Sequence, residues 1–174
     1  LDILGPAHTW KTQALAEQPP RDGVLAGNLY LKGSGDPTLT LERFWLLLRQ
    51  LRARGITTIV GDLVLDRSDF RLPPHDPAAF DNEPLRPYNA GPDALLTNFK
   101  SVRLTLIPDA GTRSVAAIID TPLDDVRVDA RLQYADGACG DWREKLSVAV
   151  TGTTLALTGS LAGSCGEKAL HVSP

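Results

Sequence analysis

A strand, a helix and a second strand are predicted in succession over residues 28–65, and this pattern constrains the fold more than any other feature of the sequence. Apolar and polar residues alternate over 28–32, as in a half-buried strand, and an apolar run returns over 58–65. Between them, apolar residues recur at the helical spacings of three and four; these are Leu41, Phe44, Trp45, Leu48 and Leu51. Because such a unit normally forms a right-handed parallel crossover, we expect the two strands to pair in parallel.

The ends of the predicted helix carry their own signals. Thr40 is a suitable N-cap, and Glu42 suits the first turn, where the helix dipole favours a negative charge. Arg52 and Arg54 suit the last turn, and Gly55 suits the left-handed residue that commonly follows a helix. The sequence therefore predicts a helix over residues 41–54.

From residue 101 onward the sequence has the alternation that is typical of β-strands. Candidate strands occupy residues 102–106, 115–119, 126–134, 146–150, 154–157 and 169–172. Residues 151–153 contain a Gly between two of these runs and predict a hairpin. The predicted fold class is therefore α+β, with an α/β module over residues 1–98 followed by a mainly antiparallel β module over residues 99–174.

Charge and apolar runs argue against two classes of function. The chain has 18 Lys and Arg against 21 Asp and Glu, a formal net charge of −3 at pH 7, whereas domains that bind nucleic-acid phosphates usually have a basic excess. The longest apolar run, Phe44–Leu48, is far shorter than the roughly 20 residues that span a bilayer. We therefore predict no nucleic-acid partner and no membrane span.

The first six residues, Leu1–Pro6, resemble the end of a helix, because Gly and then Pro commonly follow a helix C-terminus. The few residues before that Gly cannot form a stable helix alone. The chain also contains no Met. We therefore expect the body of this helix to lie upstream, in a longer polypeptide from which the chain is processed or excised.

Residues 71–92 contain six prolines and predict a long loop without regular structure, of the kind that often has a functional role. Asp81, Asn82 and Glu83 lie in this loop between Phe80 and Tyr88. Carboxylates beside aromatic rings can line a cleft that contacts a polar substrate. An ordinary surface loop accounts for the same residues, so the sequence alone leaves both interpretations open.

Cys139 and Cys165 are the two cysteines of the chain, and they allow a disulfide, two buried thiols or half of a metal site. A zinc site needs about four ligands at short spacing, whereas the three histidines are scattered singly. No metal is therefore predicted. A bridge would close a loop of 27 residues, counting both ends, and the residues alone leave the disulfide and the free thiols open.

Two motifs invite a catalytic interpretation. Gly33–Asp36 follows a strand and precedes a helix, but it completes neither the dinucleotide pattern nor the P-loop pattern, so a structural turn is favoured over a phosphate site. His75 and Asp76 are adjacent, but no Gly-x-Ser-x-Gly or comparable nucleophile motif accompanies them. We therefore predict that both motifs are structural or simply exposed.

Three longer stretches resemble one family of enzymes. They are Gly23–Leu39, which contains Gly-Ser-Gly-Asp-Pro-Thr-Leu, Gly61–Asp66 and Tyr88–Leu95. Together they resemble the D-alanyl-D-alanine carboxypeptidases/endopeptidases of the penicillin-binding protein 4 type, which are DacB-like serine peptidases. The resemblance covers nearly the whole chain. A Cys-x-x-Trp region with a second Cys downstream also resembles the family and implies a disulfide and an oxidising compartment; its residues here are Cys139, Trp142 and Cys165.

Members of this family trim peptidoglycan peptides with a serine in a Ser-x-x-Lys helix, and Ser-x-Asn and Lys-Thr-Gly motifs complete the site. None of the three patterns occurs in this sequence. The resemblance therefore implies a non-catalytic insertion between the first two motifs of a periplasmic or cell-envelope enzyme, inactive alone and without a cofactor. Its implied partners are a missing transpeptidase-like catalytic domain and, through it, peptidoglycan stem peptides. In the family, the catalytic cleft is bordered by the loop that corresponds here to Asp81, Asn82, Glu83 and Tyr88.

Two competing interpretations belong to other functional classes. The first is a stand-alone periplasmic module that binds the cell wall without hydrolase activity, which retention on purified sacculi would favour. The second is a small α/β enzyme that acts on a phosphorylated metabolite, which saturable nucleotide binding near Gly33 would favour.

Overall fold

The computed structural model describes residue 5 and residues 7–174, and it has the predicted α+β fold class. The predicted helix end at residues 1–6 lies outside the described residues, apart from Gly5. The chain divides into two compact units. The first comprises Leu1–Asp76 and Gly91–Phe99, and the second comprises Pro77–Ala90 and Lys100–Pro174. The proline-rich segment is thus shared between the units.

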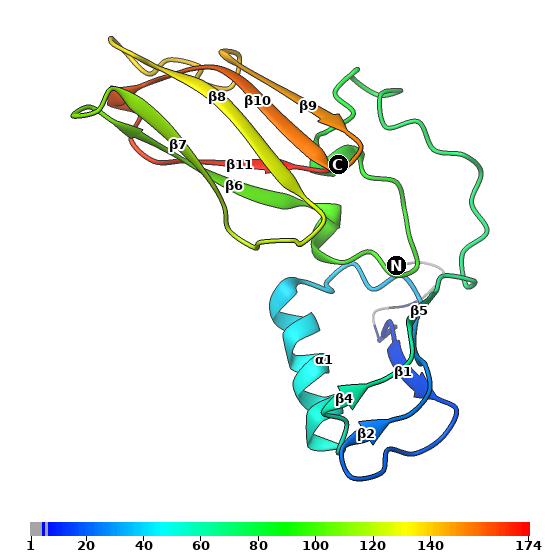
Figure 1. Cartoon of the computed structure of the whole chain (residues 1–174). Helices are drawn as coiled ribbons and strands as arrows, with labels where there is room; N and C mark the ends of the chain where they lie inside the picture. Colours follow the sequence, from blue (N-terminus) through cyan, green and yellow to red (C-terminus); the bar gives the residue numbers. More distant parts are fainter. Residues whose placement is uncertain (1–4, 6) are drawn as a thin grey trace. The chain divides into compact units, whose positions relative to one another are not determined.

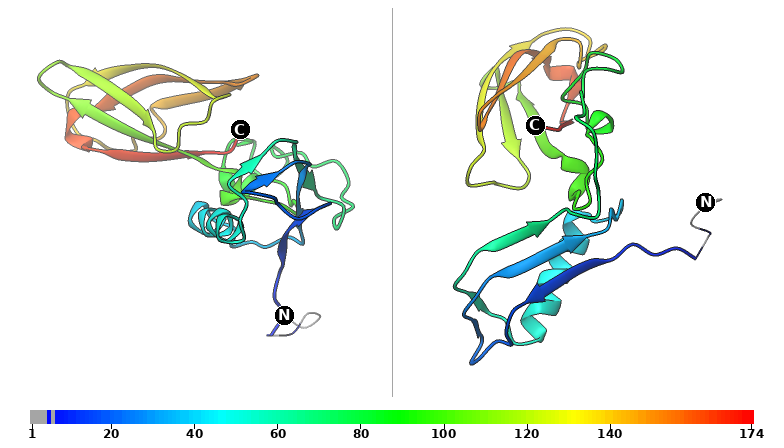
Figure 2. Two further views of the ribbon diagram at one scale, coloured as in Figure 1. Left: turned by 60° about the horizontal axis from the view of Figure 1, so that its bottom comes forward. Right: turned by 90° about the vertical axis from the view of Figure 1, so that its right-hand side faces the viewer.

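The first unit is built on a three-stranded sheet with the order β1-β3-β5, and one helix lies on one side of it (Figures 1 and 2). Strand β3 pairs antiparallel with β1 and parallel with β5, and a short parallel pair, β2 with β4, continues beside it. The elements are β1 (Thr12–Ala16), β2 (Val24–Leu25), β3 (Leu29–Gly33), α1 (Leu41–Ala53), β4 (Thr58–Ile59) and β5 (Leu63–Asp66).

Helix α1 begins where the sequence predicts and ends one residue earlier. The Thr40 side chain caps it by accepting a hydrogen bond from the backbone N–H of Arg43, and Gly55, with φ of +87°, follows its C-terminus. The predicted apolar face is only partly buried. Leu51 packs in the core, whereas Leu41, Trp45 and Leu48 remain exposed, because the helix turns only one side of this stripe to the sheet.

The prediction of one continuous strand over residues 58–65 is wrong, because the segment forms β4 and β5 with a break at Val60–Asp62. The neighbouring strand is interrupted at the same level, between β2 and β3. A Cβ on Gly61 would lie 2.7 Å from the Gly27 carbonyl oxygen, so the two backbones approach closely here. The Asn28 side-chain oxygen accepts a hydrogen bond of 2.8 Å from the Asp62 N–H in place of a ladder bond.

The second unit is a six-stranded sheet with the order β11-β6-β7-β8-β10-β9. All neighbouring strands are antiparallel except β8 and β10, which pair in parallel, and the predicted hairpin at residues 151–153 is confirmed. Residues of β6 and β10, which are three places apart in the sheet, share one hydrophobic core, so the sheet curls on itself (Figure 2). The strands are β6 (Val102–Asp109), β7 (Ser114–Ile119), β8 (Arg127–Ala135), β9 (Leu146–Thr151), β10 (Thr154–Ala162) and β11 (Lys168–Val172).

A disulfide joins Cys139 to Cys165, with their Cα atoms 4.7 Å apart. It connects the segment after β8 to the short 3₁₀ helix Gly163–Cys165 after β10. Trp142 is buried in the same core cluster as Cys165. Of the interpretations that the residues alone left open, the disulfide is therefore the one that the structure shows.

Candidate functional site

The Asp81 carboxylate organises the loop of the second unit in which the sequence predicts a site. It accepts hydrogen bonds of 2.7 Å from the Tyr88 hydroxyl and 2.7 Å from the Asn89 side-chain amide. It also accepts a bond of 3.0 Å from the backbone N–H of Glu83. Asn82, between them, has φ of +60°, a left-handed conformation that Asn tolerates well. The structure thus brings three predicted residues, Asp81, Glu83 and Tyr88, into one hydrogen-bonded turn.

Asn89 is a buried member of this turn that the sequence does not single out. Its side-chain amide donates to both Asp81 and the Glu83 carbonyl oxygen, the latter at 3.0 Å, and it lies in the short 3₁₀ helix Pro87–Asn89. A buried polar side chain of this kind is normally satisfied by hydrogen bonds. The available signal was its place next to Tyr88 in the stretch that resembles the family.

The loop is fixed to the curled sheet of the second unit. The backbone N–H of Ser173, just after β11, donates a hydrogen bond of 2.8 Å to the Leu85 carbonyl oxygen. The Leu85 side chain packs against the core cluster of the sheet. These two contacts hold the loop, and with it the Asp81 turn, against the sheet.

The hydrogen bonds of the Asp81 turn shift the pKa values of Asp81 and Tyr88 in opposite directions. The bond from Tyr88, followed by those from Asn89 and Glu83, lowers the pKa of Asp81, and the bond to Asp81 raises the pKa of Tyr88. Because the folded state lowers the pKa of Asp81, its stabilising effect is complete above about pH 4 and is lost as the pH falls through the folded pKa. At neutral pH the turn presents an ionised Asp81 and a neutral phenol.

The pKa of Tyr88 gives a direct test of this geometry. In Asp81→Ala, the hydrogen bond and the negative charge that raise the pKa are both removed, so Tyr88 should ionise at lower pH than in the wild type. The measurement is an alkaline titration followed by the ultraviolet absorbance of the phenolate. Asp124→Ala, in the exposed β7–β8 loop, is the control and should leave the curve in place. Superimposable curves for Asp81→Ala and the wild type would show that the bond does not form.

A groove of about 690 Å³ lies beside this turn, within the second unit. Residues 82–86 form one wall, and parts of β9 and β11 line it as well. Glu83 and Arg86 form an ion pair of 3.3 Å at its rim. The charged or titratable side chains that line the groove have both signs and are Glu83, Arg86, Asp141, Arg143, Glu144 and His171. Such a lining suits a polar ligand with both positive and negative groups.

The same loop carries two exposed aromatic rings, which are not among the residues that line the groove. The Tyr88 side chain is 66% exposed although its hydroxyl is bonded, and Phe80 is 84% exposed. Aromatic side chains that present one apolar face and one polar end are common in binding surfaces. In this loop the Tyr88 ring is thus exposed while its hydroxyl is held by Asp81.

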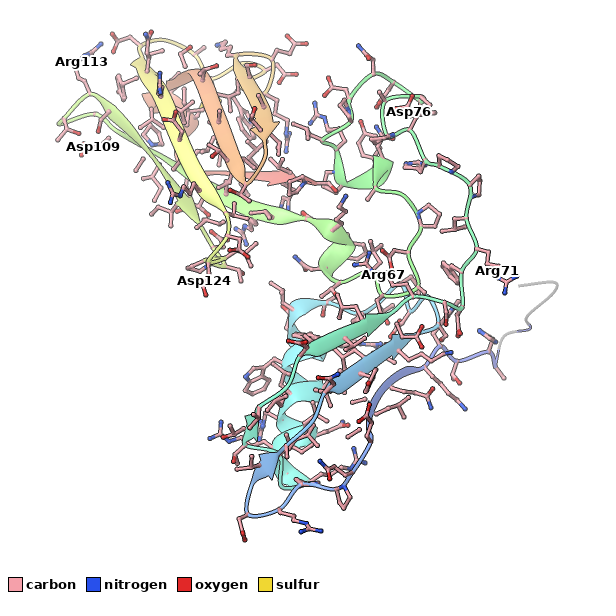
Figure 3. The ribbon with its side chains drawn as sticks, turned by 45° about the vertical axis from the view of Figure 1, so that its right-hand side comes forward. Arg67, Arg71, Asp76, Asp109, Arg113 and Asp124 are labelled. Carbon is pink, nitrogen blue, oxygen red and sulfur yellow. A yellow bond between two sulfur atoms is a disulfide. The ribbon has the colours of Figure 1, made fainter. Side chains whose placement is uncertain are left out.

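The other motifs have structural surroundings in the first unit. Asp36 accepts hydrogen bonds of 2.9 and 2.7 Å from the backbone N–H and hydroxyl of Thr38, which is a self-contained turn. A Cβ on Gly91 would lie 2.8 Å from the ring of His75, so this histidine packs against backbone. Figure 3 shows Arg67, Arg71 and Asp76 along the irregular chain that leads into the loop, where Arg67 forms an ion pair of 3.3 Å with Asp93.

Within the described part of the chain, no group of three or more His, Cys, Asp or Glu side chains is placed to hold a metal ion. The same residues contain no helix that is both long and apolar enough to cross a membrane.

Part of the chain is similar to two curated D-alanyl-D-alanine carboxypeptidases. A D-alanyl-D-alanine carboxypeptidase from Actinomadura sp. (strain R39) is 37% identical over 70 residues, which are 40% of this chain and 13% of that protein. The D-alanyl-D-alanine carboxypeptidase DacB from Haemophilus influenzae is 43% identical over 61 residues, which are 35% of this chain and 13% of that protein. The chain thus matches only a small part of the length of each relative.

Solved structures extend the similarity over most of the chain. The crystal structure of penicillin binding protein 4 (dacB) from Haemophilus influenzae has a TM-score of 0.70 and 25% identity, over 92% of this chain and 36% of that one. Its complex with a novel β-lactam has the same fold, with a TM-score of 0.64 and 24% identity over 98% of this chain and 35% of that one. The sequence also matches one protein family over residues 1–173. This chain therefore belongs to the D-Ala-D-Ala carboxypeptidase 3 (S13) family.

Proposed function

We propose that the chain is a non-catalytic insertion segment of a serine-type D-Ala-D-Ala carboxypeptidase/endopeptidase that remodels peptidoglycan in the periplasm or cell envelope. The proposal rests on the family match over residues 1–173 in a sequence without Ser-x-x-Lys, Ser-x-Asn or Lys-Thr-Gly. A serine hydroxyl is a weak nucleophile unless a base activates it, and oxyanion donors must stabilise its intermediate. The chain alone therefore forms no acyl-enzyme, and the transpeptidase-like catalytic domain lies in the rest of the longer protein.

The insertion comprises two modules, an α/β module over residues 1–98 and a mainly β module over residues 99–174. The passage of the chain from the first compact unit to the second after Phe99 supports this boundary. The segment 77–90 leaves the first module and packs with the second unit. It is the segment that we propose as the substrate-facing part of the insertion.

We propose that the loop of Asp81, Asn82, Glu83 and Tyr88 helps to present the peptide stem to the catalytic serine. Asp81 holds the Tyr88 hydroxyl at 2.7 Å and leaves its ring exposed, so the ring can pack on a peptide. The Glu83 carboxylate, 56% exposed and beside Arg86 at the groove, can accept hydrogen bonds from a cationic or amide group. Together they supply positioning, which raises the rate by holding the scissile bond near the nucleophile.

Labelling with fluorescent penicillin tests the assignment of the catalytic group. The 174-residue chain should remain unlabelled, because it has no activated serine, whereas the full-length protein should form a covalent adduct. The readout is in-gel fluorescence after denaturation, with boiled full-length protein as the control. A labelled 174-residue chain would overturn the proposal. An unlabelled full-length protein, with the chain retained on purified sacculi, would instead favour a stand-alone wall-binding module.

The role of the loop is tested by Glu83→Ala/Tyr88→Ala in the full-length enzyme. Loss of both contacts should lower kcat/KM on stem peptides by about tenfold, because binding energy that positions the substrate is removed. Penicillin labelling of the same variant should persist, since the nucleophile is unchanged. The matched control is Glu17→Ala/Tyr30→Ala, a hydrogen-bonded pair in the first unit, which should leave kcat/KM within about twofold. An unchanged kcat/KM in the loop variant would contradict the proposal that this loop presents the peptide stem.

A further inference from the structure

The groove of the second unit is lined by two segments that differ in how their charges are compensated. In the loop segment, Glu83 and Arg86 form an ion pair of 3.3 Å and so neutralise each other. The other segment is Cys139–Lys145, which we call the 139–145 wall. Its Arg143 and Glu144 line the groove and are both exposed, and neither forms an ion pair with another described residue. The 139–145 wall therefore offers the groove one uncompensated charge of each sign.

The 139–145 wall is fixed to the rest of the unit at several points. Cys139 is bonded to Cys165, and Trp142 is buried in the core of the sheet. The Lys145 ammonium donates a hydrogen bond of 3.1 Å to the Cys139 carbonyl oxygen. The Arg143 guanidinium lies 4.7 Å from the centre of the Trp142 ring, a distance at which a cation is attracted to an aromatic face. Because the wall is already ordered, a ligand that binds its charges loses little affinity to the ordering of the protein.

The apolar part of the groove belongs to the two strands that end the sheet. Its side chains are Leu146 and Val148 of β9 and Leu170 and Val172 of β11. Strand β9 is the last in the strand order, so one of its edges has no strand partner among the described residues (Figure 1). An extended peptide can bury apolar atoms against such side chains and bond its amides to such an edge. The groove therefore suits a peptide with charges of both signs.

We propose that this groove binds the leaving peptide of a crosslink, with a carboxylate on Arg143 and an amino or amide group on Glu144. The inference rests on the proposed function, in which Glu83 and Tyr88 hold the stem that is cut. Glu83 also lines the groove, so the groove begins beside that stem. A monomeric stem releases a single D-Ala, whereas a crosslink releases a whole second peptide. The second peptide has the length and the charges that a groove of about 690 Å³ accommodates.

The preference of the full-length enzyme for crosslinked over monomeric peptides tests this assignment, with products separated by liquid chromatography. Arg143→Gln/Glu144→Gln removes both charges from the groove. It should lower the ratio of kcat/KM for crosslinked dimers to kcat/KM for monomers by at least about tenfold, mainly through a higher KM for dimers. The matched control is Asp129→Asn/Arg131→Gln, an ion pair of β8 outside the groove, which should leave the ratio within about twofold. An unchanged ratio in the groove variant would overturn the inference, as would a wild type that cleaves monomers but no dimers.

Salt provides a second readout that needs no variant. Raising the ionic strength from about 0.05 to about 0.5 M screens exposed charges, so it should raise the wild-type KM for dimers at least about threefold more than the KM for monomers. In Arg143→Gln/Glu144→Gln this difference should disappear, because both charges are gone. Equal salt effects on the two wild-type KM values would overturn the inference. Penicillin labelling separates the claims: a labelled enzyme without these effects contradicts only the inference, and an unlabelled one contradicts the proposed function.

Discussion

Reduction of the Cys139–Cys165 bond should lower the free energy of unfolding of the second unit by about 3.5 kcal/mol. The bond closes a loop with a sequence separation of 26 residues, and its loss returns the corresponding conformational freedom to the unfolded chain. It also ties the segment after β8 to the end of β10, beside the buried Trp142. Since domains of this size are stable by only about 5–15 kcal/mol, the loss is a large share of the total.

Urea unfolding followed by circular dichroism measures this effect. With a slope of about 1–3 kcal/mol per molar urea, the midpoint should fall by about 1.2–3.5 M when reductant is added. Cys139→Ala/Cys165→Ala without reductant is the matched variant and should have nearly the midpoint of the reduced protein. Equal urea midpoints with and without reductant would contradict the prediction. A midpoint of the double variant far below that of the reduced protein would show that the substitutions also disturb packing.

Elements with local signals could be predicted from the sequence. Thr40 and Gly55 mark the two ends of α1 through side-chain capping and a left-handed backbone, both of which act within one turn of the helix. The Gly152 turn sets the register of β9 and β10 in the same local way, with Thr151 opposite Thr154. Such features need no knowledge of distant residues, so the order of the sequence is sufficient.

Elements that depend on distant partners could not be predicted. Strand β1, Thr12–Ala16, lacks the β-branched and aromatic run that marks a strand, and it forms because it pairs with β3. Its Ala14 lies opposite Leu31 and packs against the core cluster that contains Leu51 of α1. The break at Gly61 likewise arises from the adjacent backbone at Gly27, which no local pattern reveals.

For the candidate site, the residue types could be predicted from the sequence, but their arrangement could not. The residue types Asp81, Glu83 and Tyr88 were recognisable from the sequence, because carboxylates and an aromatic ring cluster in one proline-rich loop. Their arrangement was not, since it depends on the buried amide of Asn89 and on the bond from Ser173 to Leu85, which lies far along the chain. The loop can act as a positioned element only because the last strand of the second unit holds it there.

Gly159→Ala should destabilise the second unit by about 3–5 kcal/mol, through strain in β10, which lies between β8 and the edge strand β9. Gly159 lies in β10 with φ of +116°, where side chains are rarely accommodated. An added Cβ would lie 2.1 Å from the Lys145 carbonyl oxygen. That oxygen accepts a hydrogen bond of 3.1 Å from the Ser160 N–H, so it cannot move aside without breaking a second contact.

The same hairpin offers a matched control for this glycine. Gly152→Ala removes the same backbone freedom from the unfolded chain, at a position with φ of +58° and no atom within 4 Å of the added Cβ. It should cost only about 1–2 kcal/mol, the ordinary penalty of a left-handed residue. The urea midpoints of the two variants measure the difference in stability. Equal midpoints would show that the Lys145 carbonyl can move aside without a cost. Leu146, next to Lys145, lines the charged groove. Because Gly159→Ala should displace Lys145, it should also shift this wall of the groove. The width of the groove would then depend on one glycine of β10.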